Sequence, residues 1–292
     1  MEITMKNQYF GDVGDYGKYA MLRYLANDGI KIAVNWYLTS DDGSNDGKFT
    51  TYLEKGDMSS YDKSLFELLK EMVAKGERSI EAFEKADVIK DAVYYSETLS
   101  ESKAQRKEWH QNGLKACADA ELVFLDPDNG LTESKAPKGS NKFCFPEEIA
   151  DYYHAGQNVV YYCQKARRTY DQWEAAKGLM QKYLPDCKIF VITYHKGTQR
   201  SYIFVLHQQN YRRYATLMSQ FCRKWFRIFT EETCGNGAIS GGTTGEKFHV
   251  VNSEGVELTI EEMANGTVNL KRSDRPHEMM CISIDYFMDR LK

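Results

Sequence analysis

Short apolar runs alternate with helix-like segments between residues 15 and 208, and this alternation constrains the fold more than any other feature. Runs with the character of buried strands occupy residues 31–39, 92–99, 120–128, 158–166 and 188–208, the last being two strands around a turn. Helical spacing is found at residues 15–27, 62–75, 101–118 and 169–183, and Pro146 with two glutamates opens another helix. This order predicts a doubly wound, mostly parallel Rossmann-like α/β sheet with a terminal antiparallel hairpin.

The sequence changes character after residue 209. A basic amphipathic helix is predicted over residues 210–228, followed by a glycine-rich loop, strand-like pieces and a short helix at 258–266. The loop lacks the Lys and Ser or Thr that complete a P-loop, so we interpret it as a flexible connection. We therefore predict a Rossmann-like catalytic core at 1–209 and a small α+β appendage at 210–292.

Composition narrows the class of protein. Of 292 residues, 42% are hydrophobic and 27% charged, which is ordinary for a globular protein with a sizeable core. No apolar run approaches the roughly 18 residues of a membrane span, so we expect no membrane partner. Seven cysteines without a C-x-x-C pair argue against a zinc site or a disulfide framework and favour a cytoplasmic protein with reduced thiols.

The segment LVFLDPDNGL, residues 122–131, contains the main candidate site. An apolar strand ends in Asp126, Pro127 and Asp128, after which Asn129 and Gly130 turn the chain. Ligands of open α/β sheets bind at the carboxyl ends of the strands, so this tip is expected to face a ligand. The loop after the first strand would bring further acids to the same edge: Asp41, Asp42 and Asp46. A simple tight turn and a soluble acidic loop are the alternatives.

Basic residues gather in the second half of the chain. Between Cys187 and Thr230 there is no Asp or Glu, while the segment contains eight Lys and Arg residues. A basic surface beside an acidic site fits a phosphate-bearing partner, such as a nucleic acid or a nucleotide, and a solvated helix face is the alternative. The residues expected to bind such a substrate are Lys165, Arg167, Arg168, Arg212 and Arg213, with Arg223 and Lys224 in the same basic helix.

Three segments, GDVGDYGKYAMLRYL, WYLTSDDGSNDGKF and LVFLDPDNGL, occur in an order and spacing that resembles a known family. Over about residues 9–208 the chain is similar in outline to the large-subunit ribosomal RNA adenine-N6 methyltransferases, of the class I Rossmann-like superfamily, through an uncharacterised bacterial branch with a divergent DPDNG tip. The resemblance implies methyl transfer from S-adenosylmethionine to a base amino group. Nothing after residue 209 is covered by it.

The resemblance also implies roles for individual residues. Gly11, Asp15 and Lys18 match the family's N-terminal segment, and Tyr19 stands where that segment has a donor-contacting histidine. The residues expected to bind S-adenosylmethionine are Lys18, Tyr19, Asp41, Asp42, Gly43, Gly47 and Glu97. The residues of the expected catalytic tip are Asp126, Pro127, Asp128 and Asn129. In this tip Asp126 would accept the amino group, while Asp128 replaces a proline and Asn129 replaces an aromatic residue that stacks on the flipped base.

Two other functions fit the same residues. A phosphoesterase or nuclease could bind Mg²⁺ or Mn²⁺ through carboxylate oxygens, with Asp41, Asp42, Asp46, Asp126 and Asp128 as ligands. The methyltransferase interpretation needs no metal. A module that binds nucleic acid or protein without catalysis is the second alternative.

Overall fold

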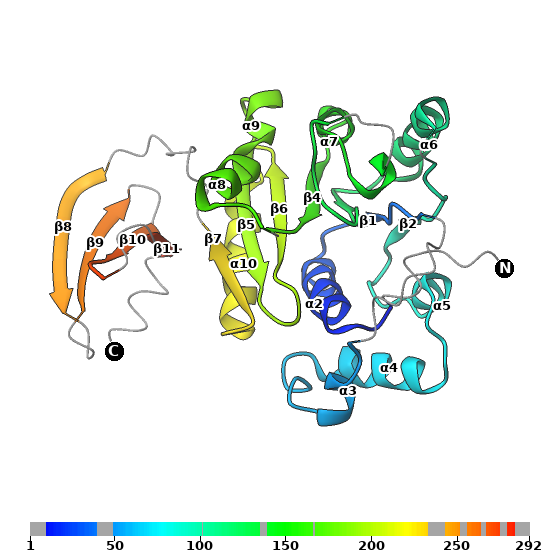
Figure 1. The fold of residues 1–292 in the computed structure, drawn as a ribbon, viewed down its shortest axis with the longest axis horizontal. Helices are drawn as coiled ribbons and strands as arrows, with labels where there is room; N and C mark the ends of the chain where they lie inside the picture. Colours follow the sequence, from blue (N-terminus) through cyan, green and yellow to red (C-terminus); the bar gives the residue numbers. More distant parts are fainter. Residues whose placement is uncertain are drawn as a thin grey trace.

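The structure, a computed structural model, describes residues 10–39, 49–100, 102–134, 139–165, 167–232, 243–251, 256–263, 267–274 and 279–283. Its main feature is a seven-stranded sheet in the order β2-β1-β3-β4-β6-β5-β7 (Figure 1). Four strands run parallel: β1 (Ile32–Asn35), β2 (Val93–Tyr95), β3 (Leu122–Leu125) and β4 (Asn158–Cys163). The predicted mostly parallel, Rossmann-like α/β sheet is therefore confirmed.

The predicted terminal hairpin consists of β5 (Lys188–Tyr194) and β6 (Arg200–Leu206). β6 pairs antiparallel with β4, so it lies between β4 and β5. The sequence predicts a core that ends at residue 209, but the main sheet continues beyond it. Helix α10 (Tyr211–Lys224) packs on this sheet, and β7 (Phe229–Glu232) pairs with β5 and forms its edge.

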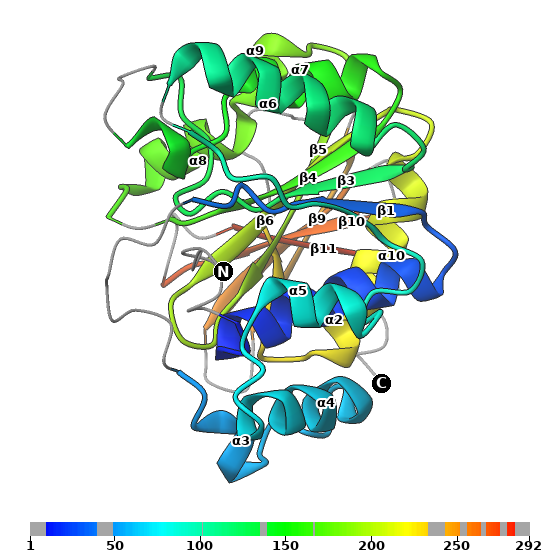
Figure 2. The same cartoon turned by 90° about the vertical axis from the view of Figure 1, so that its right-hand side faces the viewer.

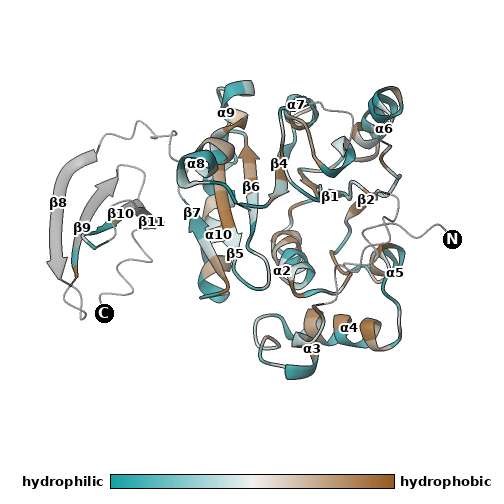
Figure 3. Ribbon diagram, in the orientation of Figure 1, coloured by the Kyte–Doolittle hydropathy of each residue, from teal (hydrophilic) through white to brown (hydrophobic). Residues whose placement is uncertain are grey.

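Helices cover both faces of the sheet (Figure 2). One face carries α2 (Val13–Asn27), α3 (Tyr52–Lys55), α4 (Lys63–Ala74), α5 (Ile80–Lys85) and α10. The other carries α6 (Lys103–Ala116), α7 (Pro146–His154), α8 (Tyr170–Gly178) and α9 (Met180–Tyr183), with a 3-10 turn at Ser140–Lys142. Apolar residues concentrate on the central strands and on helix surfaces turned toward them (Figure 3). Two hydrophobic cores result, one on each face.

Every residue of β1, β3 and β4 is buried. Strands covered on both faces have no solvent-facing positions, which explains why they appear in the sequence as continuous apolar runs. Two polar residues in them are hydrogen-bonded inside the fold. Asn35 donates to the hydroxyl of Tyr152 at 3.2 Å, and Asn158 accepts from the backbone N–H of His207 at 3.0 Å.

A second sheet is antiparallel, in the order β11-β10-β9-β8. Its strands are β8 (Thr243–Val251), β9 (Glu257–Met263), β10 (Thr267–Arg272) and β11 (Met279–Ser283). The helix predicted over residues 258–266 is wrong, because β9 pairs with both β8 and β10. Pairing on both sides satisfies the strand's backbone groups, and this tertiary context overrides a helical pattern only a few residues long. No helix in the described ranges is long and apolar enough to cross a membrane.

Candidate functional site

The glycines at the start of α2 allow the β5–β6 hairpin to approach the helix closely. A Cβ atom at Gly14 would lie 1.9 Å from the guanidinium carbon of Arg200, and one at Gly17 would lie 2.5 Å from the ring of Tyr194. The Tyr194 hydroxyl donates to the carbonyl of Val13 at 2.7 Å. The N-terminal motif therefore fixes where α2 stands on the sheet.

A buried group of three charges lies between α2 and the carboxyl end of β3. The Lys18 ammonium is 2.7 Å from Oδ1 of Asp15 and 2.9 Å from Oδ2 of Asp126. All three residues are less than a tenth exposed. The backbone N–H of Asp126 donates to the carbonyl of Asn35 at 3.0 Å, which places this charge group beside the carboxyl end of β1 as well.

The surroundings keep Lys18 charged. Burial alone would lower the pKa of the ammonium, but the carboxylates of Asp126 and Asp15 outweigh that effect and raise its pKa above the ordinary value. Burial raises the pKa of Asp15, and Lys18 opposes this shift. The Tyr19 hydroxyl donates to Oδ2 of Asp15 at 3.0 Å, so the hydroxyl of Tyr19 is used within the fold. Two acids thus share one cation.

The DPDNG tip bends the chain at Asp128 and Asn129 and is held by backbone hydrogen bonds to a later segment. The backbone N–H of Asn129 donates to the carbonyl of Lys142 at 2.8 Å, and Gly130 accepts from the N–H of Cys144 at 3.0 Å. Gly130 has a φ of +89°, and a Cβ there would lie 2.9 Å from the backbone Cα of Cys163. Only glycine meets both demands without strain. The tip is therefore docked between the end of β4 and the segment at 139–145.

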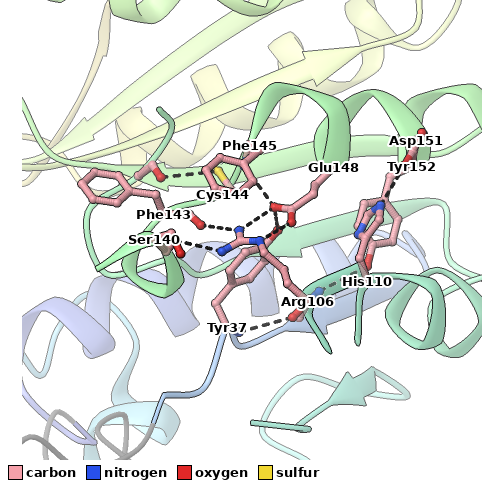
Figure 4. Close-up of polar contacts among 12 residues, drawn as sticks. Tyr37, Arg106, His110, Ser140, Phe143, Cys144, Phe145, Glu148, Asp151 and Tyr152 are labelled. Carbon is pink, nitrogen blue, oxygen red and sulfur yellow. Dashed lines mark hydrogen bonds and ion pairs between the residues drawn. The ribbon is translucent and has the colours of Figure 1, made fainter. Parts of the chain in front are cut away.

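An arginine on α6 holds this segment in place (Figure 4). The guanidinium of Arg106 forms two bonds to the carboxylate of Glu148, at 2.6 and 2.8 Å. It also donates to the carbonyls of Ser140 at 2.8 Å and Phe143 at 2.7 Å. The Tyr37 hydroxyl donates to Glu148 at 3.1 Å. Because Tyr37 follows β1 and residues 140–143 support the tip after β3, one buried ion pair links both strand ends.

Arg106 is absent from the residues suggested by the sequence. It lies in a highly charged helix, where an arginine is usually a surface residue. The signal that could have found it is helical spacing: Arg106, Trp109, His110 and Gly113 are the buried residues of α6 and recur at intervals of three and four.

The structure brings together only some of the expected site residues. Lys18 and Asp126 are in contact, and Pro127, the residue after Asp126, is buried. The side chain of Gln164 donates to the carbonyl of Asp128 at 3.3 Å, so the segment that contains Lys165 and Arg168 adjoins the tip.

Arg167 and Glu97 are exposed, and Glu97 accepts from the Tyr95 hydroxyl at 2.8 Å. Five expected residues lie outside the described ranges: Asp41, Asp42, Gly43, Asp46 and Gly47.

Arg212 and Arg213 do not join this site, contrary to the sequence-based expectation. The guanidinium of Arg213 lies 3.3 Å from Glu121 and 3.5 Å from Asp28. Glu121 precedes β3 and Asp126 follows it, so these arginines stand at the opposite edge of the sheet. α10 begins at the amino edge of the sheet because β6, which precedes it, runs antiparallel to β4. The sequence alone does not show this direction.

No protein-family model matches the chain, and no curated protein matches it. The chemistry must therefore be inferred from the site's own geometry. Among the residues that the structure describes, no cluster of three or more His, Cys, Asp or Glu is arranged to hold a metal ion. What the described site offers is a fixed carboxylate, Asp126, paired with an ammonium at the edge shared by β1 and β3.

Proposed function

We propose that the protein is an S-adenosylmethionine-dependent methyltransferase that acts on a base amino group of a nucleic acid or a nucleotide. The main support is the contact between Lys18 and Asp126. These residues come from two separate motifs of the family resemblance, 108 positions apart, and their side chains are 2.9 Å apart. The meeting of the two motifs at the carboxyl edge of a Rossmann-like sheet is what the resemblance implies.

The charges at this edge suit a ligand that carries both an amino and a carboxylate group. Two carboxylates and one ammonium provide acceptors and a donor, and Lys18 has three N–H groups, two of which face Asp15 and Asp126. The third N–H can serve the carboxylate of S-adenosylmethionine. Glu97, exposed after β2, is suited to its ribose hydroxyls, as an acid after a neighbouring strand is in dinucleotide sites. Bound S-adenosylmethionine would supply an electrophilic methyl group.

The protein's own contribution is positioning. Asp126 would accept a hydrogen bond from the substrate amino group and orient the nitrogen lone pair for in-line attack. Lys18 pairs with Asp126 and limits its movement. The Arg106–Glu148 pair holds the loop that follows Asp126. Because the ammonium of Lys18 already balances Asp126, a divalent cation bound at Oδ2 would have to displace it, which favours methyl transfer over the metal-dependent alternative.

Calorimetric titration of the purified protein tests the proposal. S-adenosylmethionine is expected to bind the wild type, and Lys18→Met is expected to weaken that binding on the order of tenfold or more, as for loss of a hydrogen bond to a charged group. Asp119→Asn, at an exposed position before β3, serves as the matched control and should bind like the wild type.

A parallel titration with Mg²⁺ or Mn²⁺ separates the alternatives. Metal binding that disappears in Asp128→Asn, together with no binding of S-adenosylmethionine, would replace the proposal with the phosphoesterase or nuclease interpretation. Binding of neither ligand would leave a binding module.

A further inference from the structure

The end of α10 and the turn that follows it combine exposed positive charge with an exposed aromatic ring. Arg223, Lys224 and Arg227 are exposed, and Phe226 among them is 42% exposed. This turn lies inside the segment from Cys187 to Thr230 that contains no Asp or Glu. We call residues 223–227 the basic turn. Exposing a large apolar side chain to water is unfavourable, and an exposed apolar group with charged residues around it is typical of a binding surface.

The basic turn is held in place by contacts with Tyr61. Trp225 is buried and stacks on Tyr61, with ring centroids 4.9 Å apart, and the Tyr61 hydroxyl donates to the carbonyl of Phe226 at 3.4 Å. Arg227 has a φ of +67°, which is uncommon for a residue with a side chain. Its guanidinium lies 5.4 Å from the centroid of the Phe226 ring. A strained backbone held by a buried anchor presents Phe226 and Arg227 in one fixed arrangement.

A continuous series of contacts joins the basic turn to the candidate site. The N–H of His195, at the tip of the β5–β6 hairpin, donates to the carbonyl of Ile228 at 2.8 Å. The same tip carries exposed Lys196. The hairpin then reaches the start of α2, where Arg200 pairs with Asp12 at 3.1 Å. Lys18, the partner of Asp126, lies six residues after Asp12 in α2, so the basic turn and the candidate site share the carboxyl edge of the sheet.

A second exposed aromatic residue stands on the same path. Phe49 is 64% exposed, and its carbonyl accepts from the N–H of Val13 at 3.1 Å. Four large apolar side chains are exposed in the described ranges. Two of them, Phe49 and Phe226, belong to segments that contact the hairpin tip: Phe49 bonds to Val13, which lies against Gly197, and Phe226 precedes Ile228 by two residues, the partner of His195. The other two, Val93 and Tyr170, lie on other elements. Two of the three exposed aromatic rings in the described ranges, Phe49 and Phe226, therefore belong to segments that adjoin the hairpin tip.

We infer that the basic turn, with Lys196 and Phe49, is a docking surface for single-stranded nucleic acid. Surfaces that bind single strands without reading sequence combine cations for the phosphates with aromatic rings on which bases stack. Arg223, Lys224, Arg227 and Lys196 would contact phosphates, and Phe226 would stack on a base. The inference rests on the proposed function, because that function places the reactive site at the carboxyl edge that the bound nucleic acid would reach. Arg212 and Arg213 have no part in it.

Fluorescence anisotropy of the full chain with a labelled single-stranded RNA of about 12 nucleotides, within the usual site size, tests this surface. Arg223→Gln with Lys224→Gln should weaken binding and reduce the slope of log affinity against log salt by about 1.4, for two single-strand phosphate contacts. Phe226→Ala should weaken binding on the order of tenfold, as for loss of one stacked base. Labelled DNA of the same sequence should show the same losses, since neither contact involves the 2′-hydroxyl.

Two matched controls accompany these variants. Lys31→Gln with Arg212→Gln removes the same charge at exposed positions on the amino edge, and Val93→Ala removes a side chain of nearly equal exposure, 40%, on β2. Both should bind like the wild type. Equal losses in control and test variants, unchanged binding in Phe226→Ala, or preference for a duplex would overturn the inference.

The titration with S-adenosylmethionine keeps the two proposals separate. Loss of RNA binding in the turn variants of a protein that does not bind S-adenosylmethionine would support the docking surface and reject the proposed function. Binding of S-adenosylmethionine together with wild-type RNA binding in the turn variants would do the opposite.

Discussion

Lys18 and Asp126 form a buried ion pair across 108 residues of sequence, and Lys18 also contacts Asp15 at 2.7 Å. One ammonium thus connects α2 to the tip that follows β3. The two carboxylates depend on the same cation.

This dependence predicts different results for the two partners. Asp126→Asn keeps an acceptor for Lys18, so the protein should fold, but turnover should fall by about 100-fold or more because the amide is a weaker acceptor for the substrate. Lys18→Met leaves two buried carboxylates without their cation and should reduce the free energy of unfolding by about 3–5 kcal/mol. Urea denaturation and single-turnover assays measure the two effects. Full activity of Asp126→Asn would show that the Asp126 carboxylate is not needed for the reaction.

Loss of the ion pair between Arg106 and Glu148 should reduce the free energy of unfolding more than loss of the neighbouring hydrogen bond from Tyr37. Arg106→Met leaves the buried Glu148 carboxylate without its cation and two backbone carbonyls without their donor, and should cost about 3–5 kcal/mol of stability. Tyr37→Phe removes one hydrogen bond and should cost about 1 kcal/mol. Hydrogen exchange at the amides of Asn129 and Cys144 should rise in Arg106→Met. Unchanged exchange there would show that Arg106 does not position the tip.

Gly130 and Gly156 allow a matched comparison of two glycines with positive φ. Their φ angles are +89° and +97°, but a Cβ at Gly130 would meet Cys163 whereas one at Gly156 would meet nothing within 4 Å. Alanine at either position has the same backbone strain, so Gly130→Ala should be the more destabilising by about 1–3 kcal/mol, from crowding alone. Thermal unfolding of both variants measures the difference. Equal losses would mean that Cys163 gives way.

Glu232, the last residue of β7, predicts a dependence of stability on acid pH. Burial alone would raise the pKa of its carboxyl, but hydrogen bonds from Thr193 and Trp173 and the nearby Lys177 ammonium lower the pKa below 4.5. A lowered pKa stabilises the fold above the unfolded value of 4.5, and this contribution is lost as the pH falls below it. The stability difference between wild type and Glu232→Gln should therefore shrink between neutral pH and about pH 3. A constant difference would contradict the lowered pKa.

Much of the fold could be predicted from the sequence because its central strands are short, mostly apolar and separated by helices with clear apolar spacing. β3 and β4 appear as unbroken apolar runs since both of their faces are buried. The contribution of β7 could not be predicted in this way. Its sequence, FTEE, has no apolar run, and it becomes a strand by pairing with the edge of β5.

The candidate site is predictable from the sequence only where residues follow strands or match a motif. Asp126 directly follows β3, and Lys18 belongs to a motif that resembles a known one. Arg106 and the basic turn depend on which faces of α6 and α10 the sheet covers. Arg212 and Arg223 belong to one helix, yet they lie toward opposite edges of the sheet. Charge counts along a sequence cannot separate them.

The contacts of α2 also affect how the chain can fold while it is being made. Asp12 pairs with Arg200, 188 residues later, and Val13 accepts from Tyr194, 181 residues later. At about 5–20 residues per second, a ribosome needs roughly 10–40 s to add that many residues. Until then the helix has no hairpin to cover it, and its apolar side is open to chaperones. Chains released before the hairpin is complete should aggregate, whereas chains released after Leu206 can already place the hairpin against α2.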